Sequence, residues 1–379
     1  MEPIHMVDLI GQHAAIENEL QDAMQRVMQT GAFVKGPEVQ AFSEELQAHT
    51  GSRFVIPCGN GTDALQIALM ALGIGPGDEV ITTGFTFIST IEVVALLGAT
   101  PVLVDVHSDT FNIQAEQVAA AITSRTKAIV PVHLFGQMAD MDALLALSEK
   151  TGIPLIEDNA QAISARWYGA EGERKDAPQS GTLGLMGTTS FFPSKNLGCM
   201  GDGGAIMTND ETIARKLQQI ANHGMSKRYH HDVVGLNSRL DGLQAAILRV
   251  KLQYLDAYCA ARQQAAARYD ALLNDTPGIQ IPVRDTRSSH VFHQYTLQVD
   301  PNRRDDLVAH MQAHGIPTGV YYPVPGHRQA AFAPFNFDLD AHPISEALSA
   351  RVISLPMHTE LTQSQQNFIC ATLIKFGLQ

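Results

Sequence analysis

The sequence predicts an α/β fold in which a mainly parallel sheet carries helices on both faces and a smaller α+β module follows. From about residue 53 to residue 160, short apolar β-rich runs alternate with helical patterns. Strands of this kind are buried on both faces, and ligands bind at their carboxyl ends. The expected strands are 54–56, 79–81, 102–104, 128–132 and 153–156.

The helical patterns divide the chain into two expected domains. A long helix from Asp241 to about Ala266 leaves the first of them, so we expect a large domain over 1–250 and a small one over 251–379. Segment 169–187, rich in Gly, Pro and charge, predicts an exposed loop. The remaining expected elements are helices at 11–30, 64–72, 305–314 and 363–376 and strands at 290–299 and 318–322.

Composition excludes several classes of protein. The 379 residues carry a formal net charge of −13, which disfavours nucleic acid or an anionic membrane as the main partner. No run of about 18 apolar residues and no signal-peptide pattern occurs, so a cytoplasmic location is expected. The four cysteines are scattered without CxxC pairing, and they predict neither a disulfide framework nor a metal site.

A glycine-containing turn follows the first expected strand. Gly59-Asn60-Gly61-Thr62-Asp63 opens a helix, and backbone N–H groups at such a helix start can bind a phosphate. A plain tight turn with Thr62 or Asp63 as the helix cap explains this motif equally well when it is taken alone.

A carboxylate ends the last of these strands. Asp158 follows the apolar run 155–156, and Gln161 comes three residues later. A carboxylate at this place can keep a pyridine nitrogen protonated, so that the ring draws electrons from a bound substrate. A metal ligand or a helix cap are the alternatives.

A third motif places one lysine among aromatic residues and glycines. Lys195 lies within 189–198, and Gly201-Asp202-Gly203-Gly204 follows. Burial lowers the pKa of a lysine and supplies the neutral amine that forms a Schiff base with an aldehyde, although a surface lysine is the alternative. Together the three motifs offer a phosphate cradle, a partner for a pyridine ring and an imine-forming amine, which predicts pyridoxal 5′-phosphate (PLP) as the cofactor.

A fourth segment, 228–241, is dense in polar side chains and predicts a substrate or interface loop. Arg239 is its candidate for binding a carboxylate or phosphate, because a guanidinium can hold either through two parallel hydrogen bonds. A salt-bridged surface loop is the alternative.

With these residues in view, the chain resembles the fold-type I PLP enzymes and, among them, the sugar aminotransferases named after DegT. The resemblance runs from Gly36-Pro37-Glu38-Val39 through 60–65 to 354–358. It implies a large domain built on a seven-stranded mixed sheet and an aminotransferase that acts on sugars. It also implies a homodimer with shared active sites.

Carried over to this chain, the resemblance implies a role for each site residue. Lys195 would form the Schiff base, Asp158 would pair with the pyridine nitrogen, and Gln161 would bind the phenolic oxygen. Phe87 would stack on the ring. The phosphate would be held by Gly61, Thr62 and Ser190, with Asn237 from the neighbouring subunit.

The substrate pair expected from the resemblance is L-glutamate, released as 2-oxoglutarate, and a nucleotide-linked keto-sugar. The branch that this chain resembles acts on UDP-2-acetamido-2-deoxy-3-oxo-D-glucuronate, in bacterial surface polysaccharide (O-antigen, lipopolysaccharide) biosynthesis. Another dTDP-, UDP- or GDP-keto-deoxysugar aminated at C3 or C4 is the alternative. Arg239, Tyr322 and His327 are the candidates for substrate binding, and the chain has Tyr321 where the family's pattern has His before Tyr-Pro.

Three other functions compete with this interpretation. A sugar dehydratase of the same family has histidine in place of Lys195, and a non-catalytic regulator would not need Lys195, Asp158, Gln161 and the phosphate loop together. A nicotinamide-dependent dehydrogenase would need GxGxxG after its first strand, which is missing here.

Overall fold

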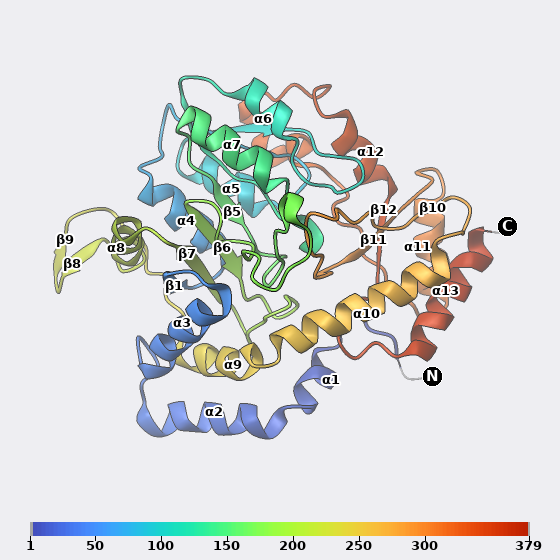
Figure 1. Ribbon diagram of the computed structural model, residues 1–379, viewed down its shortest axis with the longest axis horizontal. Coiled ribbons are helices and arrows are strands. Elements are labelled where there is room, and N and C mark those ends of the chain that lie inside the picture. The colour runs from blue at the N-terminus through green and yellow to red at the C-terminus, as the bar shows by residue number, and fades with distance from the viewer. Residues whose placement is uncertain (1–2, 378–379) are drawn as a thin grey trace.

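The computed structural model describes residues 3–377 (Figure 1). Its centre is one seven-stranded sheet. Two groups, β3-β2-β4 and β5-β6-β7-β1, are joined by parallel bridges from Ile129 to Leu155 and from Val132 to Asp158. All pairings are parallel except those of β7, which runs antiparallel to β6 and β1. The strands are β1 Phe54–Cys58, β2 Glu79–Thr83, β3 Thr100–Val104, β4 Thr126–Ile129, β5 Ile156–Asp158, β6 Met186–Ser190 and β7 Gly204–Thr208.

Helices cover both faces of this sheet, and the strand residues alternate between two buried clusters. Val55 and Ile81 belong to the first cluster, whereas Ile56 and Val80 belong to the second. This period of two, apolar on both sides, confirms the expected α/β class. The helices of this part are α1 Leu9–Ala14, α2 Glu17–Thr30, α3 Pro37–Thr50, α4 Gly61–Ala71, α5 Ser89–Leu96, α6 Ala115–Ala121, α7 Met141–Thr151, α8 Glu211–Ile220 and α9 Gly242–Leu252, with 3-10 turns η1 Leu134–Gly136 and η2 Gly169–Glu171 and the hairpin strands β8 Met225–Lys227 and β9 His230–His231.

The C-terminal part is an α+β unit with its own core. Helix α10 contributes Leu255 and Cys259 to the first cluster of the large sheet and Ala266 and Tyr269 to the C-terminal core, so it belongs to both. The domain boundary near residue 250 stays a prediction. The elements here are α10 Leu255–Leu273, β10 Ile279–Gln280, β11 Tyr295–Val299, α11 Arg304–Ala313, η3 Gly326–Arg328, η4 Ala330–Phe335, α12 Pro343–Arg351, β12 Val352–Leu355 and α13 Gln363–Gly377.

Two long helices expected from the sequence are each divided in two. The segment 241–266 contains α9 and α10, because the amides of Gln253 and Tyr254 bond to the carbonyl three residues back instead of four. The segment 11–30 likewise contains α1 and α2, with the amide of Ile16 bonded to the carbonyl of His13.

Three further expectations are corrected. The strand expected at 318–322 is absent; only one bridge, between Gly319 and Ser354, forms there. The strand expected at 290–299 begins at Tyr295. The segment 169–187 is exposed over much of its first half, but from Ala177 onward most of it is covered. Among residues 3–377, no helix has the length and apolar character needed to cross a membrane.

Candidate active site

A cavity of about 610 Å³ lies at the carboxyl ends of the central strands. Asp158 ends β5, Ser190 ends β6, and Gly61 begins the helix that follows β1. Residues of the C-terminal part, His293, Gln294, Tyr321 and Tyr322, also line the cavity. Of the residues predicted from the sequence, it brings together Gly61, Thr62, Phe87, Asp158, Gln161, Ser190, Lys195 and Tyr322.

The start of α4 forms a cradle for an anion. The cap is Asn60 rather than Thr62 or Asp63: its side-chain oxygen accepts the amide of Asp63 at 2.8 Å. The amides of Gly61 and Thr62 have no acceptor within residues 3–377. A Cβ on Gly61 would lie 2.7 Å from Cβ of Ser190, so only glycine leaves this space open. Two free amides at a helix start, beside a serine hydroxyl, fit a phosphate group.

Lys195 lies on the loop after β6 and lines the cavity. Its Nζ makes no hydrogen bond or ion pair with any residue of the described chain. Burial lowers the pKa of Lys195 to about 8, and the Asp158 carboxylate opposes this shift. The amine is therefore far more available as a nucleophile near neutral pH than that of an exposed lysine.

Asp158 is buried at the floor of the cavity, with 5% of its surface exposed. Its Oδ2 accepts the hydroxyl of Thr90 at 2.8 Å, and its Oδ1 accepts the amide of Ala160 at 3.2 Å. Burial raises the pKa of Asp158, while these two donors and the charge of Lys195 lower it. Asp158 and Lys195 both line the cavity, and no direct ion pair joins them.

Gln161 is oriented by two hydrogen bonds. Its Oε1 accepts the amide of Phe135 at 2.7 Å, so its amide nitrogen faces the cavity and donates to the hydroxyl of Tyr322 at 3.0 Å. The second N–H of the same group remains available for a phenolic oxygen. Burial raises the pKa of Tyr322, so its hydroxyl stays protonated and can donate in turn.

A buried network behind Asp158 was not predicted from the sequence. Glu157 is fully buried, and its carboxylate accepts Nε2 of His133 at 2.8 Å and the amides of Gly181, Leu183 and Gly184 at 2.7, 2.8 and 2.6 Å. This explains why the second half of 169–187 is covered rather than exposed. His293 also lines the cavity, and its Nδ1 is buried without a partner.

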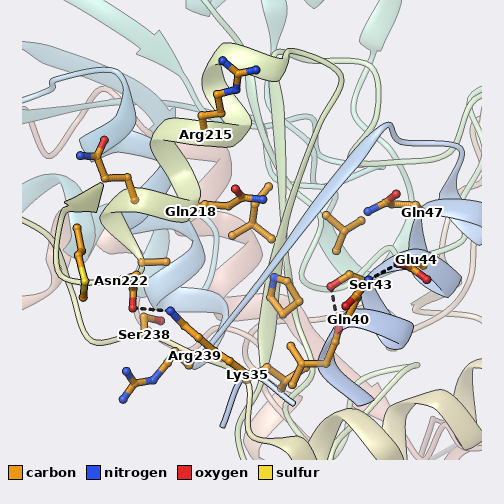
Figure 2. Close-up of a pocket in the computed structure, with 18 of the residues that line it drawn as sticks. Lys35, Gln40, Ser43, Glu44, Gln47, Arg215, Gln218, Asn222, Ser238 and Arg239 are labelled. Atoms are coloured by element: carbon orange, nitrogen blue, oxygen red, sulfur yellow. Dashed lines mark hydrogen bonds between the residues drawn. The ribbon is translucent and has the colours of Figure 1, made fainter. Parts of the chain in front are cut away.

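Three of the predicted residues lie outside the cavity. Asn237 is exposed, and Arg239 lines a second cavity of about 770 Å³, beside Lys35, whose Nζ donates to Asn222 at 2.6 Å (Figure 2). His327 is buried, and its Nε2 bonds to Glu346 at 2.7 Å. Within one chain, none of the three lines the cavity that contains Lys195 and Asp158.

Known proteins resemble this chain over nearly its whole length. Residues 14–374 match the DegT/DnrJ/EryC1/StrS aminotransferase family. The UDP-2-acetamido-2-deoxy-3-oxo-D-glucuronate aminotransferase of Pseudomonas aeruginosa is 47% identical over 98% of this chain and 99% of its own length. The UDP-N-acetyl-3-dehydro-alpha-D-glucosamine 3-aminotransferase of Acidithiobacillus ferrooxidans is 44% identical over 96% and 95%. A "pleiotropic regulatory protein" of Geobacillus stearothermophilus is also 44% identical, over 98% of each chain.

Solved structures show the same fold. DesV of S. venezuelae, in complex with a ketimine intermediate, superimposes over all of both chains with a TM-score of 0.94 and 38% identity. NtdA of Bacillus subtilis, with its bound cofactor PMP, the amino form of PLP, superimposes over 96% of this chain and 82% of its own with a TM-score of 0.87 and 30% identity. The chain accordingly belongs to the DegT/DnrJ/EryC1/StrS family and is a PLP-dependent sugar aminotransferase.

Proposed function

We propose that this enzyme transfers an amino group from L-glutamate to UDP-2-acetamido-2-deoxy-3-oxo-D-glucuronate. The observation that carries the choice of sugar is the 47% identity, over nearly the whole of both chains, with the P. aeruginosa enzyme of that name. The A. ferrooxidans relative acts on a UDP-sugar that is likewise named as a 3-keto compound, which supports amination at C3 of a UDP-linked substrate.

The cavity residues fit PLP, and each has a task in this proposal. When bound, PLP supplies an aldehyde for the amine and a ring that accepts electrons from the substrate. Gly61, Thr62 and Ser190 hold its phosphate, and Phe87, whose surface is 54% exposed, covers its ring. Gln161 donates its free N–H to the phenolic oxygen, since its oxygen is already bonded to Phe135.

Lys195 and Asp158 carry the chemistry. Lys195 would supply the amine that binds the cofactor and would then move a proton to and from Cα of the amino acid. The same residue reverses these steps on the keto-sugar. Asp158, ionised, keeps the pyridine nitrogen protonated throughout.

Substrate binding draws on Tyr322 in this cavity and on residues that lie outside it. Tyr322, which lines the cavity and keeps its proton, donates a hydrogen bond to the sugar. Asn237 and Arg239 lie outside their own chain's cavity, which supports a homodimer in which they complete the neighbouring site. Arg239 then binds an anionic group of the substrate. His327 has its Nε2 bound to Glu346, so it contributes to the substrate site only through the segment that it holds.

The setting follows from the substrate. Nucleotide-linked amino-uronates are building blocks of bacterial surface polysaccharides, so we place the reaction in O-antigen biosynthesis and the enzyme in the cytoplasm. A relative named as a dTDP-3-amino-3,4,6-trideoxy-alpha-D-glucose transaminase, 40% identical, makes a dTDP-linked keto-deoxysugar the second candidate.

The test measures the two half-reactions separately. Glutamate added to the PLP-loaded enzyme should shift the visible absorption band of the cofactor, and the UDP-3-keto-uronate should restore it with formation of an amino-sugar detected by mass spectrometry. The matched dTDP-keto-deoxysugar serves as the competing substrate, and a higher kcat/KM for it would overturn the choice of sugar. Lys195→Ala should abolish both half-reactions, and a variant that still transaminates would overturn the role of Lys195.

A further inference from the structure

Thr90 lies beneath the cavity, in the first turn of α5, and is 1% exposed. Its Oγ1 is 2.8 Å from Oδ2 of Asp158, and the two residues are 68 positions apart in the sequence. Other oxygens near this hydroxyl are the carbonyl of Phe87 and Oγ1 of Thr86, both at 3.4 Å. The carboxylate is the nearest acceptor and the one that carries charge, so it takes the single proton of Thr90.

This hydrogen bond matters because of where Asp158 lies. A buried carboxylate tends to take up a proton, and burial does raise the pKa of Asp158. A protonated Asp158 could not stabilise a positive pyridine nitrogen. The two donors to the carboxylate, the Thr90 hydroxyl and the Ala160 amide, both favour the ionised form, and the hydroxyl is the one supplied by a side chain.

The two donors also set the orientation of the carboxylate. They bind different oxygens, Oδ2 from α5 and Oδ1 from the turn after β5, so the carboxylate is held from two elements. Rotation about the Cβ–Cγ bond would break both contacts. The lone pairs that remain free are thereby fixed relative to the cavity.

We infer that Thr90 is a positioning residue that keeps Asp158 ionised and correctly oriented for the ring nitrogen of the cofactor. The inference rests on the role proposed above for Asp158. Thr90 does not line the cavity, and it acts on the cofactor only through that carboxylate.

Binding of two cofactors that differ at one atom tests this role. PLP and its analogue 1-deazapyridoxal 5′-phosphate, in which C–H replaces the ring nitrogen, are titrated into the cofactor-free enzyme and followed by absorption. In Thr90→Val, which keeps the shape of the side chain but loses the hydroxyl, the Kd for PLP should rise about ten-fold or more. The Kd for the analogue should not rise, because it has no nitrogen for Asp158 to hold.

The controls separate this role from packing. Thr90→Ser keeps the hydroxyl and should restore the preference for PLP. Thr82→Val removes another fully buried hydroxyl, which donates to the carbonyl of Val130 at 2.8 Å, and should leave the preference unchanged. Thr90→Cys, with a weak thiol donor of similar size, replaces Thr90→Val if that variant folds poorly.

Each outcome has one meaning. If Thr90→Val weakens the binding of PLP and of the analogue equally, or weakens the binding of neither, Thr90 does not act through Asp158 and the inference is overturned. If the wild-type enzyme itself fails to prefer PLP over the analogue, or Asp158→Ala keeps the preference, then the proposed role of Asp158 fails. If Asp158→Ala abolishes the preference for PLP over the analogue and Thr90→Val reduces it, the roles of Asp158 and Thr90 are both supported.

Discussion

Replacing Glu157 by Gln should unfold the enzyme more easily than any substitution of an exposed charge. Glu157 has no exposed side-chain surface, and its two oxygens accept four hydrogen bonds, from Nε2 of His133 and from the amides of Gly181, Leu183 and Gly184. Glutamine has one oxygen and one NH2 group. Each carboxylate oxygen of Glu157 accepts two of the four hydrogen bonds. In either orientation of the glutamine amide, its NH2 group would therefore face two donors, and those two hydrogen bonds would be lost.

The expected cost follows from these contacts. Hydrogen bonds to a charged group contribute about 1.5 to 3 kcal/mol each, and leaving donors buried without an acceptor carries a similar penalty. Losing two of them gives a loss of about 4 kcal/mol in the free energy of unfolding, a large part of the ~5 to 15 kcal/mol typical of a folded protein.

Urea denaturation of the cofactor-free enzyme, followed by circular dichroism, measures this loss without the added stability of a bound cofactor. Glu211→Gln is the matched control, because Glu211 pairs with Arg215 across one helical turn and both side chains are more than half exposed. Glu211→Gln should lower the free energy of unfolding by about 0.5 kcal/mol or less. The reasoning would be refuted if Glu157→Gln lowered the free energy of unfolding by no more than Glu211→Gln does.

Two further predictions concern buried lysines. The rate at which the cofactor-free enzyme forms its imine with PLP should rise with pH and level off above about 8, because only the neutral amine of Lys195 reacts and its pKa is about 8. In Asp158→Ala the midpoint, followed by visible absorption, should move lower, and a wild-type midpoint near 10.5 would contradict the assignment. Lys251 is 1% exposed and burial lowers its pKa to about 8, so Lys251→Met should raise the free energy of unfolding at pH 7 by about 3 kcal/mol. Since the unfolded chain binds the extra proton of Lys251 between pH 8 and 10.5, stability should rise more steeply over that range in the wild type than in the variant. Thermal melts that show a less stable variant at pH 7 would exclude this account.

The parts of the site that could be predicted from the sequence are those carried by consecutive residues. Three short motifs could each be recognised from neighbouring residues: the phosphate turn, Asp158 with Gln161, and Lys195. The structure brings all of them to one cavity. The strand before the phosphate turn and the one that leads to Asp158 were predicted from apolar runs, whereas β6, which carries Ser190 and leads to Lys195, was not. Helix divisions were missed, since the change in hydrogen bonding at Gln253 leaves no mark in the apolar pattern.

Residues that act through long-range contacts could not be found in this way. Thr90 looks like an ordinary member of an apolar helix, and only the fold brings it to Asp158. Glu157 cannot be told from its neighbour Asp158 by sequence alone, because its partners Gly181, Leu183 and Gly184 lie 24 to 27 positions away. The available signal was polarity beside apolar segments. Thr86, Ser89 and Thr90 stand at the start of a mostly apolar run, and two acids directly follow the apolar residues 155–156.

The placement of Asn237 and Arg239 has a local physical cause. Ser238 lies between them, is buried, and accepts the amide of Gly59 at 2.9 Å while donating to Asp63 at 2.5 Å, so this stretch is fastened to the back of the phosphate cradle. With Ser238 held inward in this way, the side chains on either side of it are less buried, and neither lines the cavity of its own chain. A ligand for Asn237 and Arg239 must then come from outside that cavity, and the same serine that braces one cradle would present both residues to a neighbouring subunit in the proposed dimer.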